Sequence, residues 1–382
     1  MLPRVAVIGA GAMGGWSALQ MRRVGASVTL LDQTGPAHDG ASSGDASRVF
    51  RHTYADLAMT RLAKRARALW LDFQTQWKAP LYQESGVLWL VSTDADEVEK
   101  AGLANLKREG IDHESLTRNA LAERFPQLNL EGVRYGFIEK PAGFLRARTA
   151  CQKVVEAFAR EHGDYRQTQA KLGTQTGAKL DFLKLGDGSE LCADIYLFAC
   201  GSWLKAMFPD WLGSAIRPTR QEVFTFSAPD KAVASLPVWA DHGEEFWYGI
   251  PDPKQKTFKI ANDTRGAPFD PARADRTPSC EGLARAKSKM ASRFPSLAQA
   301  PLESSRVCHY ENTPDLGLFF DRHPELTNVW VMGGGSGHGF KHGPALGEMA
   351  AEVLLQGKQP PDGFLTRRWQ NPAAKTPPLP PQ

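Results

Sequence analysis

The segment from Val5 to Asp32 constrains the fold of this chain more than any other. A short apolar run is followed by Gly9-x-Gly11-x-x-Gly14, an apolar-periodic segment and a second β-rich run that ends at Asp32. This order predicts a strand, a glycine turn, a helix and a strand within about 30 residues. The glycines permit a tight turn, close backbone approach to a pyrophosphate and close helix packing, and the helix amino end attracts phosphates. The acid at position 32 is placed to accept from a ribose hydroxyl, which favours FAD or NAD over NADP.

Length and composition allow two domains and argue against several classes of protein. The chain has 382 residues, is 42% hydrophobic and 23% charged, and carries a net charge of +4 that is spread along it. Single cores rarely grow beyond about 250–300 residues, so we expect two domains. The dispersed charge indicates neither a nucleic-acid partner nor an anionic membrane surface. No apolar run reaches the roughly 18 residues that would predict a membrane-spanning helix.

The cysteines and the first residues indicate the compartment. Five cysteines, at positions 151, 192, 200, 280 and 308, are scattered, and no pair has metal-ligand spacing. We therefore expect no metal site and no disulfides. Only four residues precede the first expected strand, which leaves no room for a signal peptide. These features together predict a cytoplasmic protein.

The rest of the chain contains segments with helical spacing and segments typical of strands. Apolar spacing predicts helices over 57–77, 94–108, 119–125, 147–162, 282–298 and 344–355, and strands over 86–91, 133–137, 194–201 and 328–332. Short aromatic and β-branched runs at 223–226, 246–250 and 257–260 predict an antiparallel sheet in a separate layer. The tail, 372–382, is too rich in proline to fold alone, and we expect it to be flexible.

A second cluster of glycines, at 333–339, lies between an expected strand and an expected helix. Small residues there let backbone approach a ligand and point a helix amino end at it. Two such turns more than 300 residues apart indicate one ligand that spans a domain and is contacted at both ends.

Four motifs in order resemble a known family. They are GAGAMG at 9–14, Ser43-Gly44-Asp45-x-x-Arg48-x-x-Arg51-His52-x-Tyr54, Cys308-x-Tyr310-x-x-Thr313-x-Asp315 and Ser336-Gly337-His338-Gly339-Phe340-Lys341. Together they resemble monomeric sarcosine oxidase and N-methyltryptophan oxidase, which are FAD-dependent amine oxidases of the D-amino-acid-oxidase superfamily. The resemblance runs from residue 1 to about 370.

The resemblance implies an α/β fold with a Rossmann-like FAD-binding domain and a substrate domain built on an antiparallel β-sheet. We expect the FAD-binding domain to comprise 1–84, 143–216 and 302–371, and the substrate domain to comprise 85–142 and 217–301. It also implies a monomer that acts on a small amino acid or amine and on O2. A secondary amino acid, N-methyl or cyclic, would lose a hydride equivalent to flavin N5 to give an imine, and O2 would reoxidise the flavin to give H2O2.

The resemblance assigns residues to this chemistry. Cys308 matches a cysteine that attaches the flavin covalently, and Arg306 and His309 beside it would help to lower the thiol pKa. Catalytic roles fall to Lys259, which would activate oxygen, and to Arg48, Tyr248 and Asp263. Substrate-binding roles fall to Arg51 and Lys341, which would clamp a carboxylate, and to Tyr54 and Tyr310. The implied cofactor contacts are Gly9, Gly11, Met13, Gly14, Asp32, Ser42, Ser43, Arg48, Gly201, Cys308, Gly335, Gly337, His338, Gly339 and Lys341.

One departure from the family pattern leaves the substrate open. Asp263 stands where sarcosine oxidases have a histidine near the substrate amine. Its carboxylate could pair with the substrate amine or with a second basic group farther out, and no general base stands out.

Three alternatives remain besides the amine oxidase. A dehydrogenase that passes electrons to a quinone or a carrier protein would keep the fold and the flavin, although Lys259 argues against it. A nicotinamide-dependent enzyme would explain the first glycine turn but neither the second cluster nor Cys308. A flavin-binding scaffold without turnover is the non-enzymatic alternative.

Overall fold

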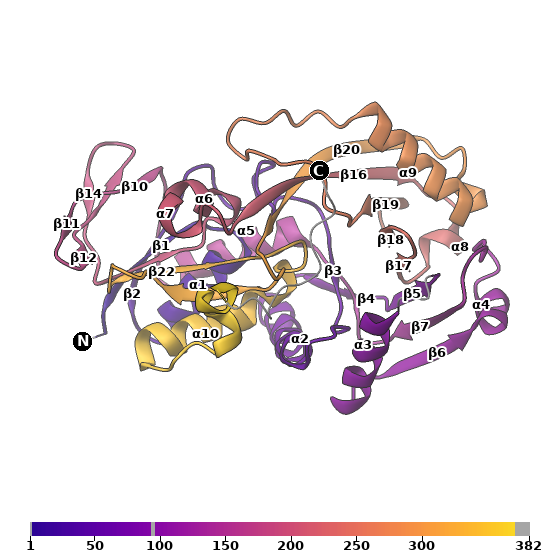
Figure 1. The fold of residues 1–382 in the computed structure, drawn as a ribbon, viewed down its shortest axis with the longest axis horizontal. Coiled ribbons are helices and arrows are strands. Elements are labelled where there is room, and N and C mark those ends of the chain that lie inside the picture. The colour runs from indigo at the N-terminus through magenta and orange to yellow at the C-terminus, as the bar shows by residue number, and fades with distance from the viewer. Residues whose placement is uncertain (1, 93–95, 371–382) are drawn as a thin grey trace.

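The structure of this chain is a computed structural model that describes residues 2–92 and 96–370, and the tail expected to be flexible lies outside them. Two large sheets dominate it (Figure 1). The α/β fold class expected from the sequence is confirmed.

The first large sheet has six strands in the order β21-β22-β15-β1-β2-β9. Its strands are β1 (Arg4–Ile8), β2 (Ser27–Asp32), β9 (Asp164–Gln167), β15 (Ile195–Phe198), β21 (Phe319–Arg322) and β22 (Val329–Gly333). All neighbours are parallel except β21 and β22. Four of the five residues of β1 are buried, as expected for a central parallel strand covered on both faces.

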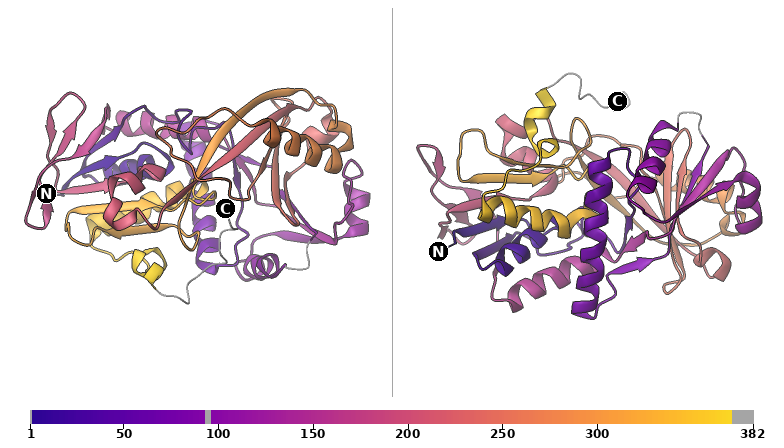
Figure 2. Two further views of the ribbon diagram at one scale, coloured as in Figure 1. Left: turned by 45° about the horizontal axis from the view of Figure 1, so that its top comes forward. Right: turned by 90° about the horizontal axis from the view of Figure 1, so that it is seen from below.

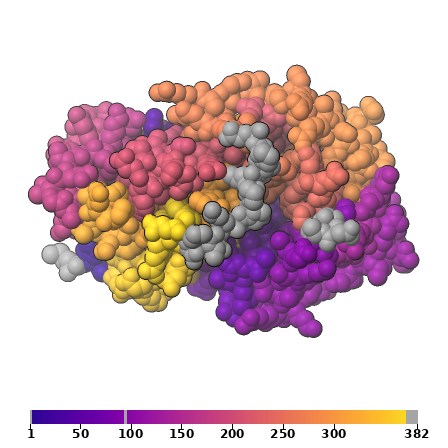
Figure 3. Space-filling view, viewed as in Figure 1, coloured from indigo at the N-terminus to yellow at the C-terminus, as the bar shows by residue number. Residues whose placement is uncertain are grey.

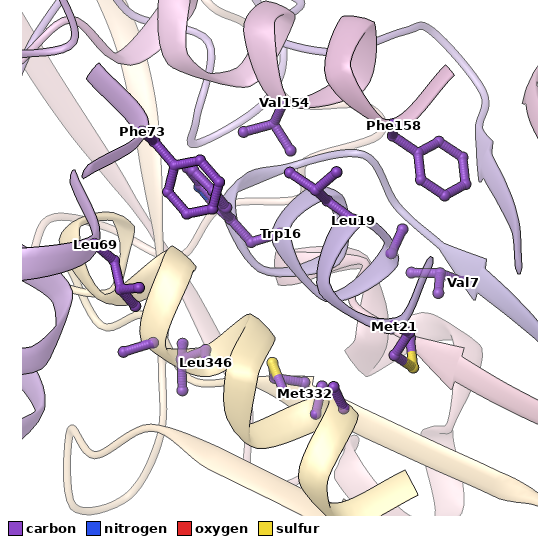
Figure 4. Packing of buried hydrophobic residues seen from close by; sticks show 14 of the residues in the cluster. Val7, Trp16, Leu19, Met21, Leu69, Phe73, Val154, Phe158, Met332 and Leu346 are labelled. Carbon is purple, nitrogen blue, oxygen red and sulfur yellow. The ribbon is translucent and has the colours of Figure 1, made fainter. Parts of the chain in front are cut away.

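Helices cover this sheet and form the largest apolar cluster. They are α1 (Ala12–Arg23), α2 (Leu57–Trp77), α5 (Ala147–Arg160) and α10 (Gly343–Gln356). Trp16 of α1 lies edge-on to Trp70 of α2 at 5.2 Å between ring centroids, and Val154 of α5 and Leu346 of α10 join the same cluster (Figure 4). The expected strand–turn–helix–strand unit is therefore confirmed. Helices α2 and α5 pack around its helix, α1, together with α10 from the far end of the described chain.

The second large sheet has eight strands in the order β20-β16-β19-β18-β17-β5-β7-β6. Its strands are β5 (Val87–Val91), β6 (His113–Thr117), β7 (Tyr135–Glu139), β16 (Arg217–Ser227), β17 (Val238–His242), β18 (Phe246–Asp252), β19 (Thr257–Asn262) and β20 (Leu302–Asn312). Every neighbouring pair is antiparallel except β17 and β5. The antiparallel layer expected from the aromatic runs is confirmed, and 85–142 supplies three further strands.

Helix α9 (Cys280–Arg293) packs on one face of this sheet, where Ala286 and Met290 meet Phe258 and Ile260. The sequence predicted that this helix would continue to residue 298, and this is wrong. Phe294 caps the helix and Pro295 begins a separate 3-10 turn, because proline cannot continue the ladder of helical hydrogen bonds.

Smaller elements complete the fold. They are β3 (Arg48–Phe50), β8 (Gly143–Leu145) and β4 (Tyr82–Glu84) in one sheet, β10 (Ala170–Leu172), β13 (Leu183–Leu185) and β14 (Glu190–Leu191) in another, the pair β11 (Gln175–Thr176) and β12 (Lys179–Leu180), and the helices α3 (Glu97–Arg108), α4 (Arg118–Arg124), α6 (Leu204–Met207), α7 (Pro209–Leu212) and α8 (Lys231–Ala234). Short 3-10 turns follow β15 and β22, at Gly201–Trp203 and Phe340–His342.

The two large sheets lie side by side along the long axis (Figure 2). The paired strands β16 and β20 run across the top from the region of the first sheet to α9 (Figure 1). In the space-filling view the violet segments near 100–140 form the lower right of the molecule and the orange segments near 280–300 the upper right (Figure 3). Among the described residues, no helix is long and apolar enough to cross a membrane.

Candidate functional site

A cavity of about 840 Å³ lies where β1, β2 and β15 end. Ile8, Asp32 and Ala199 mark the carboxyl ends of these parallel strands, and residues 308–311 of β20 close another side. Ligands in open α/β sheets bind beyond the carboxyl ends of the strands, and this volume is within the range of about 300–1,000 Å³ for small-molecule and cofactor pockets.

The structure brings most of the expected cofactor residues to this cavity. On its wall lie Gly9, Gly11, Met13, Asp32, Ser42, Ser43, Arg48, Gly201, Cys308, Gly335, Gly337 and Gly339. Gly14, His338 and Lys341 do not line it, and neither do Lys259, Arg51, Tyr54, Tyr248 and Asp263. The second glycine cluster faces the same space as the first.

The first glycine turn has the tight geometry that its spacing predicts. Gly9 has φ +105°, and a Cβ there would lie 2.5 Å from the carbonyl oxygen of Ala199. A Cβ on Gly14 would lie 1.9 Å from the carbonyl oxygen of Gly9. Gly14 therefore acts by holding α1 against β1, away from the cavity itself.

Asp32 ends β2 and holds the turn. One carboxylate oxygen accepts from the Ala10 amide at 2.8 Å, and the other accepts from the Thr34 and Gly35 amides at 3.0 and 2.8 Å. These bonds fix the carboxylate at the cavity wall.

The other half of the site is one face of the eight-stranded sheet. Side chains alternate along a strand, so Lys259, Ala261 and Asp263 share a face, as do Cys308 and Tyr310. Ala261 is the register partner of Tyr248, and Ala261, Tyr248 and Cys308 belong to one apolar cluster. The opposite face carries the apolar residues that meet α9.

The surroundings of Cys308 differ from the expectation. Its sulfur lies 3.7 Å from Nη2 of Arg48, a cation from β3 that sequence proximity does not reveal. The prediction that His309 helps to lower the thiol pKa is wrong. The His309 ring is turned to Ser202 at 2.8 Å, and burial lowers its pKa to about 4, so it is neutral. Arg306 donates to the Gly44 carbonyl rather than to the sulfur.

Asp45 is the centre of a buried charge cluster. Its Oδ2 lies 2.6 Å from Nζ of Lys259 and 2.6 Å from Nη1 of Arg48, and its Oδ1 lies 3.5 Å from Arg306. Burial would raise the pKa of Asp45, but these three cations outweigh it and hold the pKa well below its usual value. Burial lowers the pKa of Lys259 to about 8, although Asp45 opposes that shift. Lys259 also donates to the carbonyl of Ser47.

Arg51 and Lys341 supply two cations that no carboxylate of the described residues pairs with. Arg51 stacks over the ring of Tyr54 at 4.2 Å and lies 5.5 Å from that of Trp89. Nζ of Lys341 donates to the Tyr54 hydroxyl at 2.9 Å and to the carbonyl of His338 at 2.8 Å. Burial, and then the charge of Arg51, lower the pKa of Lys341.

Asp263 is already engaged within the chain. Its Oδ1 accepts from the hydroxyl of Tyr310 at 2.7 Å, and its Oδ2 lies 3.3 Å from Nη1 of Arg265. Arg265 also donates to the carbonyl of Ser336 at 2.9 Å. The basic group that Asp263 contacts is therefore Arg265, which the sequence did not single out.

Residues 4–353 match the FAD dependent oxidoreductase family. The chain belongs to this family. It is 30% identical to the N-methyl-L-tryptophan oxidase of Salmonella newport (strain SL254) over 373 residues, which is 93% of this chain and 95% of the relative. It is 25% identical to the monomeric sarcosine oxidase of Arthrobacter sp. (strain TE1826) over 93% of this chain and 92% of that one.

A solved structure supports the fold. The L-proline dehydrogenase from P. horikoshii superposes with a TM-score of 0.84 over 96% of this chain and 97% of that one, at 20% identity. The chain is thus an FAD-dependent oxidoreductase, and the expected flavin enzyme replaces the nicotinamide-dependent alternative.

The cavity fits FAD on grounds of its own donors. At the amino end of α1 the cap residue is Gly11 and the first turn carries no acid, so this end can face an anionic group. The Ala12 amide already donates to Oγ of Ser43 at 3.2 Å. Arg276 also lines the cavity, and its Nη1 is buried without an acceptor among the described residues. A helix amino end with no acid in its first turn and an unsatisfied cationic donor suit the pyrophosphate of a dinucleotide. Among the residues that the structure describes, no cluster of side chains could hold a metal ion.

The sequence motifs assigned no role to Asp45, Arg265 or Arg276. Asp45 stands three residues before Arg48 in the same motif, and an acid so close to an arginine is a signal of an ion pair. Arg265 and Arg276 lie in an irregular connection after β19, and their partners are distant in sequence, so no local pattern marked them.

Proposed function

We propose that this enzyme oxidises the C–N bond of a secondary amino acid, N-methyl or cyclic, to an imine, with O2 as acceptor and H2O2 as product. The observation that carries the proposal is that Arg51 and Lys341, which pair with no carboxylate among the described residues, both contact Tyr54. A carboxylate is the group that such a pair binds best, and arginine can grip it with two parallel hydrogen bonds. The names of the curated relatives, an N-methyl-L-tryptophan oxidase and a sarcosine oxidase, agree with this substrate class.

The chain's own residues bind and orient the substrate. Arg51 is held by its donation to the Thr53 carbonyl and by two aromatic rings, so it is preorganised. Lys341 uses two of its three protons on Tyr54 and on the carbonyl of His338, which leaves one for the substrate. Arg51 and Lys341 do not themselves line the cavity, so holding the carboxylate there would direct the amine and its neighbouring carbon toward it. FAD, when bound, supplies the acceptor for the two electrons.

The same proposal assigns the cofactor contacts. Gly9, Gly11, Met13 and the turn at 335–339 would hold FAD through backbone, and Ser42 and Ser43 border it. Cys308 would tether the flavin covalently, and Arg48 would stabilise its thiolate during attachment.

Lys259 would provide the cation that stabilises negative charge as O2 is reduced. It is 5% exposed and hydrogen-bonded to Asp45, so its charge acts in a dry environment where it is least screened. Tyr248 would pack beside the substrate from β18.

We also propose that the enzyme is a cytoplasmic monomer and that its domains divide at the limits expected from the sequence. The five cysteines are all free, which suits a reducing compartment.

A panel of N-methyl, cyclic and D-amino acids tests the proposal. Anaerobic mixing should bleach the flavin absorbance with N-methyl or cyclic amino acids, and the same substrates should give H2O2 under air. Bleaching without peroxide would indicate a dehydrogenase that uses another acceptor. Bleaching by none of these amino acids would overturn the assignment.

A further inference from the structure

The hydrogen bond between Tyr310 and Asp263 determines what the tyrosine can offer a ligand. Tyr310 lines the cavity, and its hydroxyl donates to Asp263 at 2.7 Å. A phenol has one proton, so the remaining lone pairs of this oxygen can only accept. An amine that reaches Tyr310 in the cavity therefore meets an acceptor, which can take an N–H.

Asp263 is placed to take the proton that Tyr310 gives up. Its Oδ1 accepts from Tyr310, while Oδ2 lies near Arg265. Arg265 is fixed by a bond to the Ser336 carbonyl and lies 5.7 Å from the Tyr310 ring centroid, so it holds the carboxylate in line with the hydroxyl. The side chain of Asp263 is 27% exposed, which gives it a path to solvent.

We propose that Tyr310 and Asp263 form a proton relay that deprotonates the substrate ammonium, with Asp263 as the base and Arg265 as its positioning residue. The relay rests on the proposed function, because only a neutral amine can be oxidised to an imine by hydride loss. It supplies the general base that the sequence did not reveal.

Two protons move in this relay, and each bond that breaks is matched by one that forms. An N–H bond of the ammonium breaks as an O–H bond forms on Tyr310. The original O–H bond of Tyr310 breaks as one forms on Oδ1 of Asp263, which then releases the proton to solvent. The tyrosine ends as it began, and the cation lost by the substrate matches the anion lost by Asp263.

The tyrosine favours this concerted transfer over ionisation. Burial, and then Asp263, raise the pKa of Tyr310 well above its usual value, so a free phenolate is disfavoured. The other titratable or charged groups that face the pair are Tyr54, Tyr248, Cys308 and Lys341, and His338 faces Arg265. Burial lowers the pKa of His338 to about 3, so it does not compete as a base that changes charge near neutrality.

The pH dependence of anaerobic flavin reduction tests the relay. General-base catalysis typically contributes about 10²–10⁴-fold, so Asp263→Asn and Tyr310→Phe should each slow reduction by that range at pH 7. Both variants should recover as the pH rises toward the pKa of the substrate amine, because the free amine needs no base. Asp270→Asn is the matched control. It removes an exposed carboxylate from the same connection and should leave the rate unchanged, because among the described residues this carboxylate accepts only from the Ala272 amide.

A binding measurement keeps the test independent of turnover. 2-Aminoisobutyrate has no hydrogen on its α-carbon, and acetate has no amine. Calorimetric titration in buffers of different ionisation enthalpy should show that wild-type enzyme releases about one proton per site on binding 2-aminoisobutyrate and none on binding acetate. Asp263→Asn should bind 2-aminoisobutyrate without proton release.

The outcomes separate the two proposals. A wild type that no secondary amino acid bleaches refutes the proposed function, while calorimetry still decides the relay. Equal losses of rate at every pH, or unchanged proton release in Asp263→Asn, would overturn the relay and leave Asp263 a structural residue.

Discussion

The buried ammonium of Lys259 predicts how the reaction with O2 depends on pH. Its pKa is lowered to about 8, chiefly by burial, so the cation is lost as the pH rises through that value. The protonated fraction falls from about nine-tenths at pH 7 to about one-tenth at pH 9, which is close to tenfold. If the cation stabilises the charge that develops on O2, reoxidation of the reduced enzyme should slow by about tenfold over this range.

Removing Asp45 should move that transition. A hydrogen bond to a charged group contributes about 1.5–3 kcal/mol, and one pKa unit corresponds to about 1.36 kcal/mol. Asp45→Asn replaces the carboxylate that lies 2.6 Å from the ammonium, so the pKa of Lys259 should fall by about one to two units. The midpoint of the pH profile should move from about 8 to about 6–7.

Stopped-flow mixing of the substrate-reduced enzyme with O2 measures this directly. Lys259→Met should lose the pH dependence and reoxidise about 10²–10³-fold more slowly, the range seen when one charge-stabilising donor is removed. Lys254→Met, which removes an exposed lysine from the turn before β19, is the control and should behave as wild type. A wild-type rate that stays constant up to pH 10 would refute the role of Lys259, as would an unshifted midpoint in Asp45→Asn.

Three further predictions follow from the site. Cys308→Ser should release its flavin on acid denaturation while wild type and Cys280→Ser, which lacks an exposed thiol, retain theirs; release from wild type would refute the tether. Arg51→Met should raise KM about 10- to 150-fold through the loss of a charge-assisted hydrogen bond, with a smaller effect on flavin content, and steady-state kinetics would show whether it does. Gly14→Ala places a methyl group 1.9 Å from a carbonyl oxygen, so it should cost about 1–3 kcal/mol of unfolding free energy in a denaturant titration and reduce FAD binding; a stable, yellow variant would contradict this.

Local periodicity was enough to predict most of the fold. The spacing of Leu57, Leu62, Leu69 and Phe73 gave α2 its correct bounds, because the apolar stripe of a helix is written in consecutive residues. The strand–turn–helix unit was equally clear. The predicted end of α9 was wrong, because the apolar spacing continues past Phe294 whereas the α-helical backbone ends before it.

The candidate site was predictable in part. Side chains alternate along a strand, so the even spacing of Lys259 and Asp263 implies that they share one face, and the spacing of Cys308 and Tyr310 implies the same for that pair. Contacts between strands were not predictable, because Asp45 and Lys259 are 214 positions apart and a single sequence carries no pairwise distance. The role predicted for His309 was wrong for a related reason. Neighbouring side chains in a strand point to opposite faces, so the His309 ring points away from the Cys308 sulfur, and the cation near that sulfur is Arg48.

The position of β22 has a consequence for the order of events during synthesis. This strand, at Val329–Gly333, pairs with β15, which in turn pairs with β1 at the start of the chain. The ribosome therefore releases the opening glycine turn long before the closing one, and the nucleotide cavity stays unfinished until β22 and the turn at 335–339 have been made. Flavin loading is then a late event in biogenesis, and nascent chains stalled before residue 329 should retain no cofactor.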